Sequence, residues 1–202
     1  MTARILILPL LVCGTALAQR HEIGLTLGRF TPLERAGGGL RLDLGGGTAL
    51  QANYGFRLIE GRMASLYTEV HFLASPQRLV SSPEVALTRD VASLYAIPGL
   101  RLKFLPGSRI SPYAVVGVGV AWYEQSTKVL SGALNGAPRE AIRGALDFGG
   151  GFDLPLWRFI GVRAEVRDFY TGSLAYNTGA IAGGQHNVVL GGGFILKLGR
   201  GE

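Results

Sequence analysis

Apolar and polar residues alternate in one segment of this chain after another, and this alternation restricts the possible folds more than any other feature. In the segment 48–58 the even-numbered residues are mostly apolar and the odd-numbered ones are polar or small. The first group is Leu50, Ala52, Tyr54, Phe56 and Leu58, and the second is Gln51, Asn53, Gly55 and Arg57. A period of two residues predicts a β-strand with two different faces. About ten residues per segment is the length that crosses a bilayer as a tilted strand.

Eight segments show this pattern, and we predict one strand for each. Their approximate ranges are 21–30, 48–59, 63–74, 93–104, 112–123, 139–153, 160–170 and 185–198. The parity of Leu40, Leu42 and Leu44 matches the second segment, so that strand is open to an upstream extension. Pro98 lies inside the fourth segment and cannot donate to a ladder, so it predicts a bulge or a local defect. The sequence predicts an all-β fold, an eight-stranded antiparallel up-and-down transmembrane β-barrel.

The connections between these segments alternate in length. Short turns are expected at 60–62, 106–108 and 155–157, and long loops at 31–47, 75–92, 124–138 and 171–184. Short periplasmic turns opposite long extracellular loops are the layout of an outer-membrane barrel. An even number of strands then places both ends of the barrel domain on the periplasmic side.

The first eighteen residues have the pattern of an export signal. Arg4 provides a positive start, residues 5–12 are apolar, and Ala16-Leu17-Ala18 is a small-x-small cleavage pattern. We predict a signal peptide over 1–18, cleaved near Ala18/Gln19, and a barrel domain over 19–202 in the bacterial outer membrane.

Two other interpretations of this segment are disfavoured. A transmembrane helix needs roughly 20 apolar residues, and the run here is shorter. A lipoprotein signal would end at Cys13, the single cysteine of the chain, but Val12 before it is bulkier than such signals accept. Without Cys13 the exported domain has neither a disulfide nor a thiolate nucleophile.

Aromatic residues gather near both ends of the predicted strands. At the long-loop ends these are Phe30, Phe72, Trp122, Tyr123, Phe169 and Tyr170, and at the short-turn ends Phe56, Phe104, Phe152, Trp157 and Phe159. Two aromatic belts at the two membrane interfaces are typical of a transmembrane barrel, and a soluble barrel needs neither.

Charged residues on the polar face of the strands must point into the lumen. An eight-stranded barrel is just wide enough for side chains, so these charges have to pair there. The predicted lumen ion-pair network is Glu69, Arg101, Asp147, Arg163, Glu165 and Arg167. His71, Lys103 and Lys197 share the same inward parity.

Three stretches of sequence carry a resemblance to a known group. They are GTALQANYGFRL (47–58), IPGLRLKF (97–104) followed by ISPY (110–113), and GVRAEVRDFY (161–170). The chain resembles the small eight-stranded outer-membrane β-barrel proteins, the opacity-like and OmpA-transmembrane-like group. These stretches indicate an architecture and no particular chemistry. Barrels of this group usually end in an aromatic residue that the assembly machinery reads, whereas Leu198 takes that place here and a polar tail follows.

The sequence offers little catalytic chemistry. Of its three histidines, His21 lies at the start of the barrel domain and His71 lies beside Glu69 on the lumen face. His186 and Asp168 are expected to oppose each other on the outer rim of the last hairpin. A serine beside such a pair would make a hydrolase site, and Ser173 is the nearest candidate. Nothing in the sequence holds Ser173 in place, so we predict no catalytic residues and no enzyme, with a lipid A-modifying hydrolase or acyltransferase as the alternative.

Other binding chemistries are disfavoured as well. The triplets at 45–47, 149–151 and 191–193 lack phosphate-loop spacing, and no Cys or His pair has metal-ligand spacing, so no cofactor and no metal are expected. Basic patches with interleaved aromatic residues for nucleic acid are missing. Cations in the predicted loops could contact lipopolysaccharide phosphates: Arg35, Arg78, Arg89, Lys128 and Arg139.

These observations predict a structural or surface-interaction role. The expected partners are outer-membrane lipid, lipopolysaccharide and an unknown extracellular partner of the long loops. A small-solute pore is the remaining alternative, and a filled eight-stranded lumen disfavours it.

Overall fold

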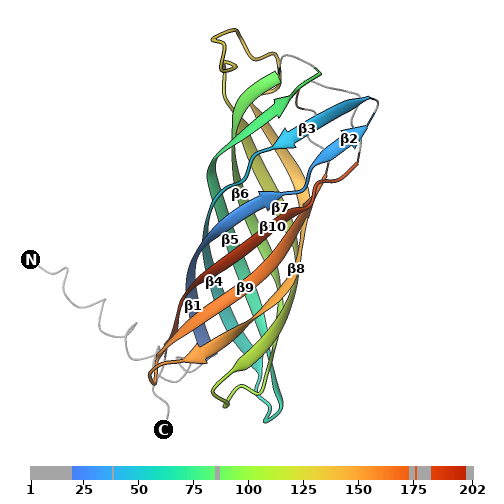
Figure 1. Cartoon of the computed structure of the whole chain (residues 1–202). Helices are drawn as coiled ribbons and strands as arrows, with labels where there is room; N and C mark the ends of the chain where they lie inside the picture. Colours follow the sequence, from blue (N-terminus) through green and yellow to red (C-terminus); the bar gives the residue numbers. More distant parts are fainter. Residues whose placement is uncertain (1–19, 38, 85–86, 173–175, 177–182, 199–202) are drawn as a thin grey trace, which may run out of the picture.

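The chain forms a closed barrel of antiparallel strands (Figure 1). The computed structural model describes residues 20–37, 39–84, 87–172, 176 and 183–198. The barrel strands are β1 (His21–Pro32), β4 (Gly47–Ile59), β5 (Ala64–Ser82), β6 (Leu87–Phe104), β7 (Ser111–Gln125), β8 (Glu140–Pro155), β9 (Ile160–Thr171) and β10 (Asn187–Leu198). β1 pairs with β10 along its whole length, which closes the ring. The predicted eight-stranded antiparallel barrel is confirmed. The described part of the chain has no helix that is long and apolar enough to cross a membrane.

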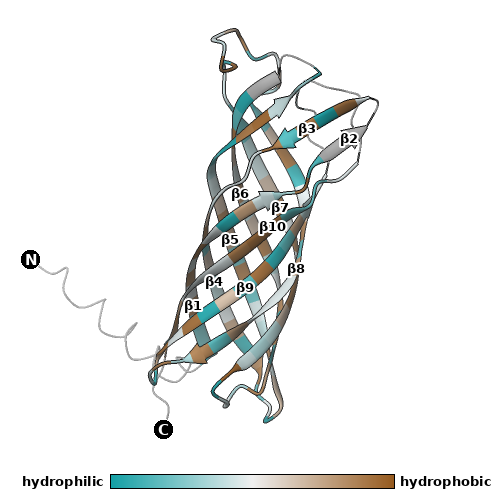
Figure 2. Ribbon diagram, viewed as in Figure 1, coloured by the Kyte–Doolittle hydropathy of each residue, from teal (hydrophilic) through white to brown (hydrophobic). Residues whose placement is uncertain are grey.

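The two faces of each strand differ as the alternation predicts. Apolar side chains such as Leu25, Val118 and Leu190 are exposed on the outer wall. Their neighbours in sequence, such as Thr26 and Val189, are buried inside. Figure 2 shows the resulting alternation of hydrophobic and hydrophilic residues along the ribbons. The outer wall is therefore the apolar surface, which is the reverse of a soluble barrel.

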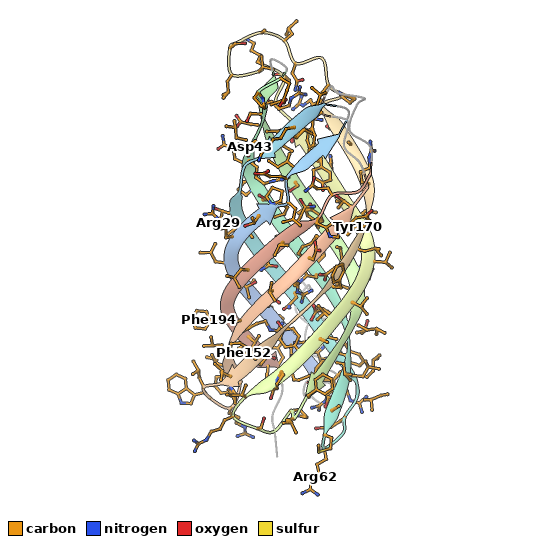
Figure 3. The ribbon with its side chains drawn as sticks, turned by 45° about the vertical axis from the view of Figure 1, so that its right-hand side comes forward. Arg29, Asp43, Arg62, Phe152, Tyr170 and Phe194 are labelled. Atoms are coloured by element: carbon orange, nitrogen blue, oxygen red, sulfur yellow. The ribbon has the colours of Figure 1, made fainter. Side chains whose placement is uncertain are left out.

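The short turns and the long connections lie at opposite ends of the barrel. β1 begins and β10 ends at the short-turn end, where His21 pairs with Leu198. Figure 3 shows Arg62 extending from that end, with Phe152 and Phe194 on the outer wall above it. We call the two ends the short-turn end and the long-connection end.

Two of the predicted long loops, 31–47 and 75–92, contain strands instead. Residues Leu40–Leu44 do not extend the second barrel strand but form a separate strand, β3, which pairs with β2 (Arg35–Gly37) and with the end of β5. The expected long loop 75–92 is mostly strand, because β5 and β6 continue to pair as far as Ser82 and Leu87. A sheet of β2, β3, β5 and β6 therefore extends past the ring.

Pro98 produces a local defect without a bulge. Pairing of β6 with β7 is interrupted at Ile97 and Pro98, and the same register resumes at Gly99. On its other side Pro98 still pairs with Val70 of β5. Register shifts occur instead at Arg57/Ile59 and at Ser75/Arg78.

Three of the aromatic residues predicted for the two belts lie inside the barrel instead of on its outer wall. Phe72 and Trp122 lie on the outer wall near the long-connection end, and Phe104, Phe152, Trp157 and Phe159 are exposed near the other end. Phe30, Tyr123 and Phe169 are buried inside the barrel instead. Strand parity explains the error, because Phe30 shares the inner face with Thr26 rather than the outer face with Leu25.

Candidate functional site

The half of the lumen nearer the short-turn end is filled by charged side chains. The carboxylates are Glu22, Glu69, Asp147, Asp153 and Glu165, and the cations are Arg101, Lys103, Arg163 and Arg167. We call these nine residues the ionic half. All nine are buried, although they come from five different strands.

Arg167 on β9 holds three carboxylates together. Its Nη2 donates to Glu69 Oε1 (2.6 Å), its Nη1 to Asp147 Oδ2 (2.7 Å) and its Nε to Glu165 Oε2 (3.0 Å). The three nitrogens of one guanidinium thus donate to carboxylates from three strands, β5, β8 and β9. Charge-assisted hydrogen bonds of this kind are about twice as strong as neutral ones.

A second group of ion pairs lies closer to the short-turn end. Arg163 forms a bidentate pair with Asp153, with Nε–Oδ1 and Nη2–Oδ2 distances of 2.7 and 3.0 Å. Lys103 Nζ lies 2.6 Å from Asp153 Oδ2 and 2.9 Å from Glu22 Oε1. Lys103 therefore joins β8 to β1 across the lumen.

Arg101 links the two groups. Its Nη2 donates to Glu22 Oε2 (2.7 Å), and its Nε lies 3.0 Å from Glu69 Oε2. The guanidinium also lies over the ring of Tyr67, 4.6 Å from its centroid. Gly55 provides the space, since a Cβ there would be 2.7 Å from Arg101 Nη2.

Neutral polar groups add further hydrogen bonds to the ionic half. Glu165 accepts from the hydroxyls of Tyr113 (2.9 Å) and Thr26 (3.0 Å), and Thr26 in turn accepts from Gln51 (2.8 Å). His71 Nε2 lies 3.1 Å from Gln51 Oε1. His71 is thus one end of a hydrogen-bonded chain that reaches a carboxylate.

The structure brings all six residues of the predicted network together. Glu69, Asp147, Glu165 and Arg167 form one group, and Arg101 links it to the second group, which contains Arg163. Two acidic members were not included in the predicted set, Glu22 and Asp153. Parity could have found both, because Glu22 alternates with Ile23 and Leu25, and Asp153 follows Asp147 at even spacing.

The other half of the lumen is mostly apolar. Phe30, Leu73, Tyr95, Ala121, Tyr123, Phe169, Tyr176 and Val189 are buried there, and we call these residues the aromatic half. The ring of Tyr95 lies 5.3 Å from Phe169 and 6.2 Å from Phe30. Its hydroxyl lies 2.8 Å from that of Tyr123, which lies 3.0 Å from Thr171 Oγ1.

Three of the five predicted loop cations are not in loops, and one of them, Arg35, begins β2. Arg78 and Arg89 lie on β5 and β6 and point into the lumen beyond the aromatic half. The register shift at Ser75/Arg78 exchanges the two faces of β5, so Arg78 is buried while Pro76 and Gln77 are exposed. Arg139 is an exposed cation, and its hydrogen bond to Glu124 (2.8 Å) raises the pKa of the guanidinium.

The predicted rim pair is formed on the outer wall of the last hairpin. His186 Nδ1 lies 2.6 Å from Asp168 Oδ2, and the imidazole lies 4.7 Å from the ring of Tyr170. In the backbone pairing Asp168 is opposite Val188, two residues beyond His186, which was predicted to be its opposite residue. Ser173 lies outside the described residues.

At the other end of the barrel, His21 Nδ1 lies 2.5 Å from the Tyr54 hydroxyl. Within the described residues, no cluster of three or more His, Cys, Asp or Glu side chains could hold a metal ion.

Comparison with known proteins identifies the architecture. Neither a protein-family model nor a curated protein sequence matches the chain. Among solved structures, it is similar to Neisserial surface protein A, with 10% identity and a TM-score of 0.55 over 88% of this chain and 96% of that one. It is also similar to the outer membrane protein OprG from Pseudomonas aeruginosa, with 14% identity and a TM-score of 0.54 over 91% and 98%. The chain therefore has the fold of the small eight-stranded outer-membrane β-barrels.

Proposed function

We propose that this chain is an integral outer-membrane barrel with a closed lumen, and that it acts through the surface at its long-connection end. In this proposal residues 1–18 are an export signal, and the long-connection end faces the outside of the cell. The expected partners are outer-membrane lipid, lipopolysaccharide and an extracellular ligand of that surface.

The filling of the lumen is the observation that carries this proposal. The ionic half places Arg167 against three carboxylates, and the aromatic half lies directly beyond it on the same strands. The described cavity along this part of the lumen, lined by Glu69, His71, Asp147 and Arg167, has a volume of about 10 Å³. A single water molecule needs about that much space, so a hydrated solute would have to displace the ion pairs.

The shape of the long-connection end supports the surface role. β5 and β6 extend past the ring, and β2 and β3 add to the same sheet. Arg41 on β3 contacts the segments next to β2 and β5. Its side chain pairs with Glu34 (2.6 Å), and its backbone N–H donates to Glu84 (3.1 Å). A sheet that projects above a membrane barrel is suited to presenting a binding surface.

The rim pair supports a second candidate, a lipid-modifying hydrolase. A histidine held by a carboxylate is two parts of a catalytic triad. The hydrogen-bond partner of the His186 imidazole within the described part of the chain is Asp168. A rim ion pair that holds the last hairpin at headgroup level accounts for this geometry, and we favour it. His186→Ala is expected to assemble normally and to leave lipid A acylation unchanged, and loss of a lipid-cleaving activity would favour the hydrolase.

Conductance across a planar bilayer tests the closed lumen. The purified barrel, inserted and checked for insertion by its heat-modifiable migration on gels, is expected to give no stepwise current. An Arg167→Ala, Phe169→Ala double variant removes one large side chain from each half and is the matched control for detecting an opened path. Stable current steps from the wild-type barrel would favour a small-solute pore.

A further inference from the structure

Two arginines lie side by side inside the long-connection end of the barrel. Arg78 on β5 and Arg89 on β6 are 2% and 1% exposed. Arg78 is opposite Val91 and Arg89 is opposite Val80, so the two arginines are diagonal neighbours on the inner face. Diagonal neighbours on paired strands lie roughly 7–8 Å apart, which is within reach of long side chains.

Neutral groups alone contact these two guanidinium groups within the described residues. Arg78 Nη2 donates to Ser93 Oγ (3.4 Å) and its guanidinium lies over the Phe30 ring (4.4 Å), while Arg89 Nη1 donates to Gln125 Oε1 (3.0 Å). The Nε atoms of both arginines are buried without a hydrogen-bond partner. Every cation of the ionic half, by contrast, contacts at least one carboxylate.

None of the nearby acids in the described residues faces inward to compensate these charges: Asp43 on β3, Glu84 after β5 and Glu124 on β7 are all exposed. Asp90, the acidic residue closest to Arg89 along the chain, has the opposite parity and faces outward. The segments 38, 85–86, 173–175 and 177–182 contain no Asp or Glu. Two permanent positive charges are therefore buried next to each other, and arginine cannot lose its proton to relieve the cost.

We propose that Arg78 and Arg89 form a binding site for an oxyanion, a phosphate or sulfate group, inside the extracellular mouth of the barrel. The planar guanidinium fork matches the geometry of such groups, and the two free Nε–H groups are donors for it. The hydroxyl of Ser75 is also buried without a partner and supplies a third donor. Gly47 leaves room beside them, since a Cβ there would be 2.7 Å from Arg78 Cγ and 3.2 Å from Ser75 Oγ.

The oxyanion has two possible sources, a free ion or the phosphate of a lipopolysaccharide headgroup. The proposal deepens the surface role and rests on the proposed function for one point, that this mouth faces the outside of the cell. The binding chemistry itself is independent of orientation, and it can be measured in detergent micelles.

Calorimetric titration with inorganic phosphate tests the site. The folded barrel in octyl glucoside is titrated at constant ionic strength set with chloride, and Arg78→Gln and Arg89→Gln are compared with the exposed control Arg139→Gln. We expect phosphate to bind the wild type and the control alike, and each buried variant to bind about tenfold more weakly, because a charge-assisted donor pair is lost. Equal binding by all four proteins, or none by the wild type, would overturn the site.

The unfolding temperature in chloride separates this role from a purely structural one. If the two charges repel each other in the absence of an oxyanion, Arg89→Gln is at least as stable as the wild type, and phosphate stabilises the wild type alone. An Arg89→Gln variant that is less stable than the wild type in chloride and gains equally from phosphate would contradict the proposal. Arg89→Lys keeps the charge without the fork and provides the titration if Arg89→Gln does not fold.

Lipid A vesicles distinguish the two sources. The barrel is inserted into vesicles that contain either phosphorylated or dephosphorylated lipid A. Stabilisation by phosphorylated lipid A that Arg78→Gln removes would assign the site to the headgroup. Binding of inorganic phosphate without any effect of lipid A phosphorylation would assign it to a free oxyanion. A pore detected in the bilayer experiment would overturn the closed lumen and leave the micelle titration unaffected.

Discussion

The two halves of the lumen fill the same narrow space in opposite ways. The ionic half uses five carboxylates and four cations, each buried and each in contact with an opposite charge. The aromatic half uses rings and aliphatic side chains, with the hydroxyls of Tyr95 and Tyr123 paired to each other. The strands that supply both halves are continuous, so the difference lies in side chains alone.

The difference shows what each kind of filling requires. An ion-pair network tolerates no missing member, because a lone charge left in the lumen is far more costly than the intact pair is favourable. A packed apolar layer loses stability gradually, in proportion to the cavity that a truncation leaves. The two halves should therefore respond differently to single substitutions.

The largest expected effect is at Arg167. Arg167→Ala leaves Glu69, Asp147 and Glu165 facing one another without their shared cation, and we expect a loss of about 3–5 kcal/mol in the free energy of unfolding. Urea unfolding of the barrel in vesicles, followed by tryptophan fluorescence, measures it. Arg139→Ala removes an exposed pair with Glu124 and should change the midpoint little. Similar midpoints for the two variants would contradict the ionic half as described.

A smaller loss is expected from truncation in the aromatic half. Phe169→Ala removes a buried ring that contacts Tyr95 and His71, and should cost about 3 kcal/mol by the same measurement. Phe194, exposed on the outer wall (Figure 3), is the matched control, and its replacement by Ala should cost less. A greater loss at Phe194 than at Phe169 would mean that the ring of Phe169 does not fill the lumen.

Removing one tyrosine hydroxyl from each half compares the stability that its hydrogen bond contributes. Tyr113→Phe removes a donor to the Glu165 carboxylate and should cost about 2 kcal/mol, whereas Tyr95→Phe removes a neutral hydrogen bond to Tyr123 and should cost about 1 kcal/mol. Both substitutions delete a single oxygen, so steric differences are small. The reverse order of the two losses would show that the charge of Glu165 is not what distinguishes the halves.

The smallest expected effect lies outside the lumen, at Glu84. The Arg41 backbone N–H and the Ser82 hydroxyl donate to this carboxylate, which lowers its pKa below the ordinary value of 4.5. Its contribution to holding β3 is thus present above pH 4.5 and is lost as the pH falls through the lowered pKa. The amide resonance of Arg41 should titrate with a midpoint below 4.5, and Glu84→Gln should abolish the titration. A midpoint at or above 4.5 would show that the hydrogen bonds do not favour the charged form.

The fold could be predicted from the sequence because an alternation with a period of two residues can be recognised within each segment alone. The strand faces, the closure of the sheet and the inward parity of residues such as Arg163 and Glu165 all follow from it. The resemblance to small outer-membrane barrels added the architecture, which the similar solved structures support.

The cross-lumen contacts and the register shift depend on how the strands are staggered, which the alternation of residues does not specify. Arg101 on β6 meets Glu22 on β1 across the lumen, and predicting that contact requires the stagger of the strands around the ring. The register shift at Ser75/Arg78 exchanges the faces of β5, so counting from Leu73 would have placed Arg78 outside. The continuation of β5 and β6 was missed because loop-like residues such as Pro76 and Gln77 interrupt the alternation.

Thiol accessibility on one strand tests the central claim that the inner face is closed to water. Val120 and Ala121 are adjacent on β7, with Val120 exposed on the outer wall and Ala121 buried in the aromatic half. Each is replaced by Cys in a protein in which Cys13, the single cysteine, is changed to Ser, and Leu134→Cys at an exposed position is the reference. In vesicles, a charged methanethiosulfonate should modify Leu134→Cys rapidly and leave Ala121→Cys unmodified, while a lipid-soluble maleimide should modify Val120→Cys. Modification of Ala121→Cys by the charged reagent at the rate of Leu134→Cys would contradict the account.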